Sequence, residues 1–255
     1  MCYDAEARPP FPPIRGAALD SGDVILTSAD GARFHAHGAR AQQAGGAGIV
    51  ILPDVRGLHP FYEELALRFA EAGAQSLAID YFGRTAGIEP READFDYAPH
   101  LAKLTYETLC ADAAAGVAYL RTADGGAPER VYTVGFCFGG RLSYLQATRG
   151  LGLAGVIGFY GPPVGVGRGG LPAPIDEVDR FESDVLALWG GADQGIPPEA
   201  VGAFEAALEE AGVEHRSVIY RGAPHSFFDR HASDHADAAT DAWRQMLEFI
   251  ELPAG

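Results

Sequence analysis

The segment that most constrains this chain is a run of glycines around one cysteine, placed directly after an apolar stretch. Val131–Val134 has the composition of a buried strand, and residues 135–140 (GFCFGG) follow it at once. Small residues flank a nucleophile in a strained strand-to-helix turn, because larger side chains would collide with neighbouring backbone. The pattern predicts a turn that exposes the Cys137 thiol. The alternative is a structural cysteine buried in a tight turn.

Two later segments add the partners that a thiol nucleophile needs. Asp193 follows the apolar run Val185–Trp189, and His225 follows the run Ser217–Tyr220. The order nucleophile, acid, histidine is that of α/β-hydrolases, and both residues come just after strands, where catalytic groups of parallel sheets collect. A thiol is only a few per cent ionised at neutral pH, so we expect His225 to act as base and Asp193 to orient it. Taken singly, Asp193 could cap a helix and His225 could be an ordinary turn residue.

Strand and helix patterns alternate along most of the chain. The expected strands of the core are 48–52, 76–80, 131–134, 155–159, 185–189 and 217–220, and the expected helices are 61–72, 106–122, 138–147, 199–211 and 231–250. This alternation predicts an α/β-hydrolase fold, a mostly parallel, doubly wound sheet with helices on both faces. Val24–Thr27 and Arg33–Ala39, joined through Asp30-Gly31, predict an N-terminal antiparallel hairpin.

The length of 255 residues and the 47% apolar composition suit one compact unit of this type. Residues 1–22 contain two pairs of adjacent prolines, so we expect an N-terminal arm there and a single α/β-hydrolase domain over 23–255. Residues 82–99 are expected to form a long loop, a kind of segment that is often functional.

Charge excludes several classes of partner. The net charge of −16 argues against binding to nucleic acid or to anionic membrane surfaces. The chain has a single lysine, Lys103, in an expected helix, which leaves little room for lysine-based catalysis. There is no 18-residue apolar run, and the first residues lack the basic and apolar regions of a signal peptide, so a cytoplasmic location is expected.

Neither a metal nor a cofactor is expected. The three cysteines (Cys2, Cys110, Cys137) are too scattered for a disulfide framework or a zinc site, and apolar neighbours favour a packing role for Cys110. His35 and His37 lie on one face of an expected strand and could in principle bind a metal, but no third ligand at a sensible spacing accompanies them.

From about Val24 onward the chain resembles the dienelactone hydrolases (carboxymethylenebutenolidases). The resemblance lies in GFCFGGR at 135–141, Gly161 after Phe159-Tyr160, Asp193, and Pro-His-Ser-Phe at 224–227. It implies a Cys-His-Asp triad that opens a lactone through an acyl-enzyme. It also implies that Asp54 stands where the family has an acidic residue, usually glutamate, that contacts the resting thiol.

Further roles follow from the resemblance and the fold. Arg84 matches the first of two family arginines that grip a substrate carboxylate, whereas the second position holds Asp229, with Arg230 next to it. Tyr160 matches a tyrosine that lines the pocket. The fold implies an oxyanion hole made by the backbone N–H groups of Phe138 and Val55.

The sequence therefore predicts a cofactor-free cysteine hydrolase, a monomer or small homo-oligomer, that cleaves a small ester or lactone, with an anionic substrate as one option. A broader carboxylesterase or thioesterase without a carboxylate requirement is an alternative. A ligand-binding protein on a hydrolase scaffold is another, because a fold does not by itself imply turnover.

Overall fold

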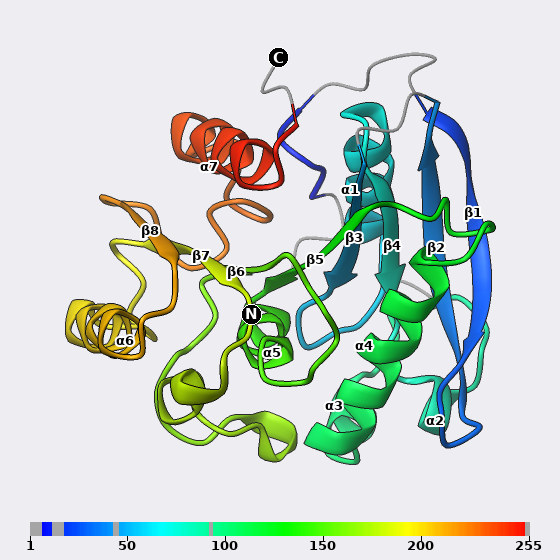
Figure 1. Cartoon of the computed structure of the whole chain (residues 1–255), viewed down its shortest axis with the longest axis horizontal. Coiled ribbons are helices and arrows are strands. Elements are labelled where there is room, and N and C mark those ends of the chain that lie inside the picture. The colour runs from blue at the N-terminus through cyan, green and yellow to red at the C-terminus, as the bar shows by residue number, and fades with distance from the viewer. Residues whose placement is uncertain (1–6, 12–17, 43–45, 92–93, 253–255) are drawn as a thin grey trace.

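The computed structural model describes residues 7–11, 18–42, 46–91 and 94–252, which are arranged around one eight-stranded sheet (Figure 1). Its order is β1-β2-β4-β3-β5-β6-β7-β8. The strands are β1 (Ala18–Thr27), β2 (Arg33–Ala41), β3 (Ala47–Leu52), β4 (Gln75–Ile79), β5 (Arg130–Phe136), β6 (Gly155–Phe159), β7 (Asp184–Gly190) and β8 (His215–Tyr220). β1 and β2 pair antiparallel, as do β2 and β4, and all other pairs are parallel. The mostly parallel sheet with an N-terminal hairpin is confirmed.

Helices cover both faces of this sheet. In Figure 1, α1 (Pro60–Glu71) and α7 (Ala236–Phe249) lie on one face, whereas α4 (Tyr106–Leu120), α5 (Phe138–Gln146) and α6 (Pro198–Glu210) lie on the other. Four short helices lie in the connections: α2 (Gly83–Ala86), α3 (Ala98–Leu101), η1 (Arg168–Gly170) and η2 (Pro174–Arg180). The two-faced covering confirms the doubly wound arrangement.

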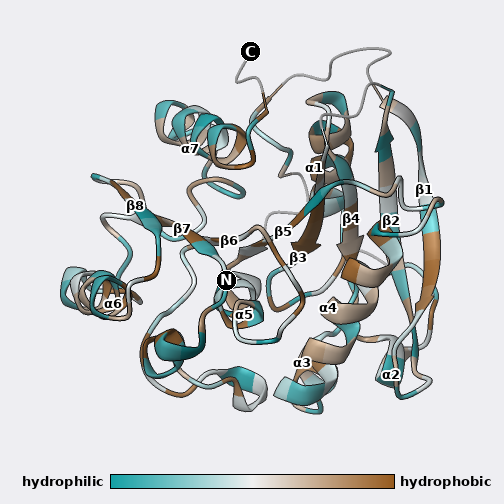
Figure 2. Cartoon of the chain, in the orientation of Figure 1, coloured by the Kyte–Doolittle hydropathy of each residue, from teal (hydrophilic) through white to brown (hydrophobic). Residues whose placement is uncertain are grey.

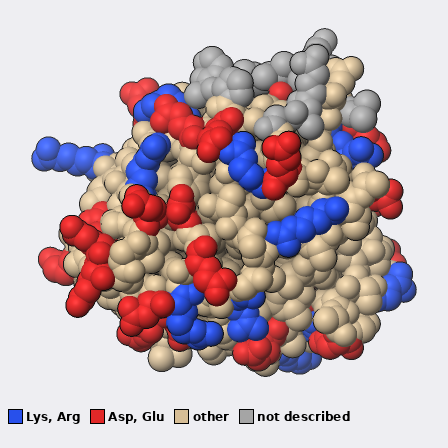
Figure 3. All heavy atoms as spheres, in the orientation of Figure 1, with Lys and Arg blue, Asp and Glu red and all other residues tan. Residues whose placement is uncertain are grey.

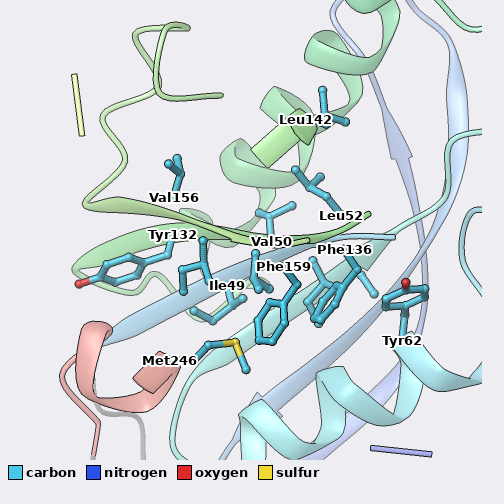
Figure 4. Packing of buried hydrophobic residues seen from close by; sticks show 14 of the residues in the cluster. Ile49, Val50, Leu52, Tyr62, Tyr132, Phe136, Leu142, Val156, Phe159 and Met246 are labelled. Atoms are coloured by element: carbon cyan, nitrogen blue, oxygen red, sulfur yellow. The ribbon is translucent and has the colours of Figure 1, made fainter. Parts of the chain in front are cut away.

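The central strands are buried on both sides, which explains their continuous apolar sequences. Every residue of β3 and β4 is buried, and Figure 2 shows β3 as mainly hydrophobic. Figure 4 shows Phe136 and Phe159, whose rings stack at 4.8 Å, beside Met246 of α7. Burial of each such side chain stabilises the fold by about 1.5–3 kcal/mol. This packing fixes the carboxyl ends of β5 and β6.

The two largest differences from the sequence-based expectation are the starts of β1 and of the last helix, and the other core elements shift by at most about two residues at their ends. β1 begins at Ala18 rather than Val24, since the hairpin pairing continues past the alternating residues. The last helix begins at Ala236 rather than His231, because residues 225–235 form successive turns that carry Phe227 and Phe228 into the core.

Part of the proline-rich N-terminal segment lies against the domain. The ring of Phe11 stacks on Trp243 of α7 at 4.8 Å, and Arg8 Nε lies 2.9 Å from a carboxylate oxygen of Glu64 in α1. Residues 1–6 and 12–17 of the expected arm lie outside the described residues, and residues 18–22 belong to β1.

Acidic and basic side chains are interspersed over the face of the molecule shown in Figure 3. Among the described residues, we find no helix with the length and apolar character needed to cross a membrane.

Candidate active site

Cys137 lies at the junction of β5 and α5 in a conformation that few side chains adopt. Its φ of 56° and ψ of −111° place it outside the regions favoured by non-glycine residues, at a cost of about 1–3 kcal/mol. The glycines around it are required by close backbone approaches. A Cβ on Gly135 would lie 1.9 Å from the carbonyl oxygen of Gly139, and a Cβ on Gly139 would lie 2.0 Å from that of Leu52. Backbone packing therefore explains the glycine pattern of the sequence.

Neighbouring strands hold this turn in place. The Cys137 N–H donates to the carbonyl oxygen of Phe159 at 2.9 Å, and its own carbonyl accepts from the N–H of Arg141 at 3.1 Å. The Cys137 side chain is partly buried at the N-terminus of α5. A helix N-terminus favours negative charge, so this position favours a thiolate.

His225 and Asp193 form a hydrogen-bonded pair at the ends of adjacent strands. His225 Nδ1 lies 2.6 Å from Asp193 Oδ2, and Asp193 Oδ1 accepts from the N–H of Gly195 at 2.8 Å. The Asp193 carboxylate is almost fully buried, whereas the His225 side chain is 27% exposed. The two loops touch, since a Cβ on Gly190 would lie 2.6 Å from the carbonyl oxygen of Pro224. A buried carboxylate on Nδ1 leaves Nε2 as the nitrogen that can exchange a proton.

Tyr160 contacts both His225 and Asp229. Its ring centroid is 4.8 Å from that of His225, its hydroxyl donates to Asp229 Oδ2 at 3.0 Å, and it is close enough to Cys137 for their charges to interact. Burial and the nearby Asp229 raise the pKa of the Tyr160 phenol well above its usual value. Tyr160 is fully buried, and its expected place in the lining of the substrate pocket stays a prediction.

Asp54 is engaged by the side chain two residues further on. Arg56 Nε donates to Asp54 Oδ1 at 3.0 Å and Nη2 donates to Oδ2 at 2.6 Å, while His59 Nε2 lies 3.8 Å away. Burial opposes ionisation of Asp54, but His59 and Arg56 outweigh it and hold the pKa of this carboxyl below its usual value. Its expected role in orienting the thiol is not tested by these contacts and stays a prediction.

The same turn presents the backbone of Val55. The Asp54 N–H donates to Tyr62 Oη at 3.0 Å, and the Arg56 N–H donates to Asp54 Oδ1 at 2.9 Å. The turn packs against the start of α5, where a Cβ on Gly139 would lie 2.2 Å from the carbonyl oxygen of Pro53. The N–H groups of Val55 and Phe138 thus belong to two segments in contact.

The two candidate substrate-binding arginines both have protein partners. Arg84 donates to Asp30 Oδ2 at 2.5 Å and to Asp112 Oδ1 at 2.7 Å, so carboxylates from the β1–β2 turn and from α4 already hold its guanidinium. Arg230 Nε lies 3.1 Å from Nε2 of His231. These contacts favour a structural role for Arg84.

The remaining candidates from the sequence lie away from this site. His35 and His37 both lie 3.1 Å from Asp23 Oδ1 on β1, and no group of three ligands able to hold a metal occurs among the described residues. Cys110 is buried in α4, and burial raises the pKa of its thiol.

Comparison with known proteins identifies the family of this chain. The family model of the dienelactone hydrolase family matches residues 34–252. The chain belongs to this family. A protein of Escherichia coli O157:H7 named "Putative carboxymethylenebutenolidase" is 30% identical over 93% of this chain and 89% of its own length, and a Synechocystis protein of the same name is 29% identical over 80% and 85%. The crystal structure of a "Putative Dienelactone Hydrolase" from Klebsiella pneumoniae has a TM-score of 0.77 at 25% identity, covering 91% of this chain and 99% of its own.

Membership of the dienelactone hydrolase family makes the chain a hydrolase of ester or lactone bonds. The sequence analysis missed the buried group formed by Asp229, Tyr160, Tyr62 and the Asp54–Arg56 pair. Only the carboxylate at position 229, where the family resemblance implies an arginine, signalled it. The other members come from segments too distant in the sequence for their contacts to be inferred.

Proposed function

We propose that this member of the dienelactone hydrolase family cleaves a small ester or lactone through Cys137, His225 and Asp193. The observation that supports this most is that the chain holds both a strained, partly exposed cysteine at the β5–α5 turn and, after β8, a histidine whose Nδ1 is fixed by a buried carboxylate. In chemistry of this kind the histidine takes the thiol proton and the carboxylate stabilises the resulting imidazolium.

The reaction follows two steps. His225 Nε2 takes the proton of Cys137, and the thiolate attacks the substrate carbonyl. The oxyanion is stabilised by the N–H groups of Phe138 and Val55. The C–O bond then breaks, His225 protonates the leaving alkoxide, and an acyl-enzyme remains on sulfur. Water, deprotonated by His225, attacks the thioester and releases the acid, and the thiolate recovers its proton.

The contacts of Arg84 favour a second candidate within the same class, a broad carboxylesterase or thioesterase with no requirement for a substrate carboxylate. A guanidinium held by Asp30 and Asp112 would have to leave at least one of them to bind an anion. The net charge of −16 gives no long-range attraction for anionic substrates.

The test uses matched substrates, p-nitrophenyl butyrate and the half ester mono-p-nitrophenyl succinate, with dihydrocoumarin as a neutral lactone. We expect Cys137→Ala to lose hydrolysis of all three. Binding of the substrates unchanged, without acyl transfer to the wild-type protein, would support the ligand-binding alternative instead.

Arg84→Ala separates the two enzymatic candidates. If Arg84 binds a substrate carboxylate, Arg84→Ala should raise the activation free energy for mono-p-nitrophenyl succinate by about 2–5 kcal/mol and so lower its kcat/KM. The kcat/KM for p-nitrophenyl butyrate should be unchanged. If Arg84 only holds the hairpin turn to α4, the losses on both substrates should be equal and small. The cytoplasmic location and the oligomeric state expected from the sequence stay predictions.

A further inference from the structure

A group of buried ionisable side chains, one of which packs against His225, has no part in the proposed chemical steps. Asp229, in the turns after β8, is 7% exposed, and Asp54 is 1% exposed. Tyr160, at the end of β6, and Tyr62, in α1, are fully buried. Asp229 Oδ2 accepts from Tyr160 Oη at 3.0 Å, and its Oδ1 accepts the N–H of Arg230. Buried polar groups of this kind are costly unless their charges are balanced.

The guanidinium of Arg56 acts on both carboxyls of this group. Arg56 gives two hydrogen bonds to Asp54, at 3.0 and 2.6 Å, and its positive charge also acts on Asp229. Burial, together with the negative charge of Asp54, raises the pKa of Asp229 to about 7, although the Arg230 N–H, Tyr160 and Arg56 each oppose the shift. The pKa of Asp54 is lowered and that of Asp229 is raised, so Asp54 is the carboxyl that favours the negative charge and Asp229 is the one that favours the proton below about pH 7.

Tyr160 connects Asp229 with the catalytic histidine. Its ring lies 4.8 Å from the imidazole of His225, centroid to centroid, at an angle of 53°. Its backbone is in an unfavourable conformation, with φ of 39°, and its N–H donates to the carbonyl oxygen of Leu188 at 2.8 Å. The hydroxyl bond to Asp229 fixes the far end of the ring, so a change at Asp229 is transmitted to the surface against which His225 packs.

We propose that Asp229 is a positioning residue for His225, which as an uncharged carboxyl anchors the Tyr160 hydroxyl and keeps the tyrosine ring against the imidazole. This inference rests on the proposed mechanism of Cys137 and His225. The uncharged form matters because Cys137 and the oxyanion must both become negative during the reaction. A second ionised carboxylate beside Asp54 would oppose both changes.

Three segments bring charged and titratable groups to Asp229. They are the β3–α1 loop with Asp54 and Arg56, α1 with Tyr62, and the end of β6 with Tyr160. On the remaining side, Asp229 lines a cavity of about 530 Å³ between residues 229–236 and the N-terminal segment. Arg8 of that segment also lines the cavity and forms an ion pair with Glu64. This cavity gives the carboxyl a path for proton exchange with solvent.

The test is the pH dependence of kcat/KM for p-nitrophenyl butyrate between pH 5.5 and 9, in wild type, Asp229→Asn, Asp229→Ala and Tyr160→Phe. Wild type should show a falling limb with a midpoint near the carboxyl pKa of about 7. Asp229→Asn keeps an acceptor for the Tyr160 hydroxyl and cannot ionise. Its kcat/KM should therefore equal that of wild type at low pH and should not fall as the pH rises through 7. Asp229→Ala and Tyr160→Phe should each lose about tenfold or more, in kcat rather than KM, at every pH, and their combination should lose no more than either alone.

The chain offers a matched control. Asp241 of α7 accepts a hydrogen bond from the hydroxyl of Tyr220 at 3.0 Å, which makes a similar tyrosine–carboxylate pair, but the Asp241 side chain is 36% exposed. Asp241→Asn should leave the pH profile of the wild type unchanged.

The proposal is overturned if Asp229→Asn keeps the falling limb of the wild type, or if folded Asp229→Ala is as active as wild type. Should the alanine variant not fold, the profiles of Asp229→Asn and Tyr160→Phe decide the matter. Loss of activity in Cys137→Ala beside a normal Asp229→Ala would reject the positioning role alone. Full activity in Cys137→Ala would instead reject the proposed function.

Discussion

At the scale of single residues, the two described cysteines have opposite surroundings. Cys137 lies at a helix N-terminus with its side chain partly exposed, whereas Cys110 is buried among the apolar residues of α4 and its pKa is raised by that burial. Reactivity of a thiol follows the fraction of thiolate and its access to solvent. The surroundings therefore favour the proposed chemical role for Cys137 and a packing role for Cys110.

The first prediction is that iodoacetamide alkylates Cys137 faster than Cys110 at neutral pH. The reason is that Cys110 is more deeply buried and has a raised pKa, and mass spectrometry of tryptic peptides measures both rates in one sample. Labelling should be repeated with a bound substrate analogue, since substrate binding can change the thiolate fraction. Preferential labelling of Cys110 with Cys137 inert would contradict the proposed nucleophile.

The second prediction concerns the hydrogen bond of 2.6 Å between His225 and Asp193. His225→Ala removes the base, and Asp193→Asn changes the imidazole tautomer, so each should lower kcat by about 10²–10⁴-fold. Because the residues act as a unit, the double variant should be no worse than the more damaged single variant. Multiplicative losses in the double variant would show that the two residues act independently.

At the scale of elements, continuous apolar runs predicted the central strands to within a few residues. Strands buried on both faces are apolar at nearly every position, so the apolar run ends close to where the strand ends. The boundaries that failed depend on tertiary contacts. Residues 231–235 have a helical pattern, yet the burial of Phe227 and Phe228 holds this stretch in turns. Similarly, the glycines of 135–140 indicated a tight turn, but only the fold shows that Leu52 and Pro53 are the backbone they avoid.

The third prediction tests that close approach. Gly139→Ala places a Cβ 2.0 Å from the Leu52 carbonyl oxygen, so we expect a loss of several kcal/mol in stability, or no folded protein. Gly202→Ala in α6, where nothing lies within 4 Å of the new Cβ, should raise stability by up to about 1 kcal/mol because alanine favours helix. Chemical denaturation compares the two, and equal effects would contradict the packing described for the β5–α5 turn.

At the scale of the whole molecule, charges far apart in the sequence pair in ways that no local pattern predicts. The proposed nucleophile, acid and base could be predicted from the sequence because each follows its own strand, and strand ends meet along one edge of a parallel sheet. Arg84, by contrast, meets Asp30 across 54 positions and Asp112 across 28, so its partners depend on how the β1–β2 hairpin lies beside α4. The surroundings of the Asp229 carboxyl could not be predicted from the sequence for the same reason, since its neighbours come from the end of β6, from α1 and from the β3–α1 loop.

The last prediction concerns global stability as a function of pH. The pKa of Asp229 is raised from an ordinary value of 3.8 to about 7 in the folded protein, so the folded state binds this proton more tightly than the unfolded state. The resulting stabilisation is complete below about pH 4 and is lost as the pH rises to about 7, a change of about 4 kcal/mol at 1.36 kcal/mol per pH unit. Asp229→Asn cannot ionise, so its stability relative to wild type should increase over this interval and level off above it. Urea denaturation at pH 4.5, 6, 7.5 and 9 measures the difference in stability between the two proteins, in which the contributions of the other titrating groups cancel.

Asp241→Asn serves as the opposite case, because the pKa of Asp241 is lowered and its stabilisation is lost only as the pH falls through that lowered value. Parallel curves for wild type and Asp229→Asn between pH 4.5 and 7.5 would show that Asp229 is ionised throughout, and would remove the basis for an uncharged carboxyl behind His225.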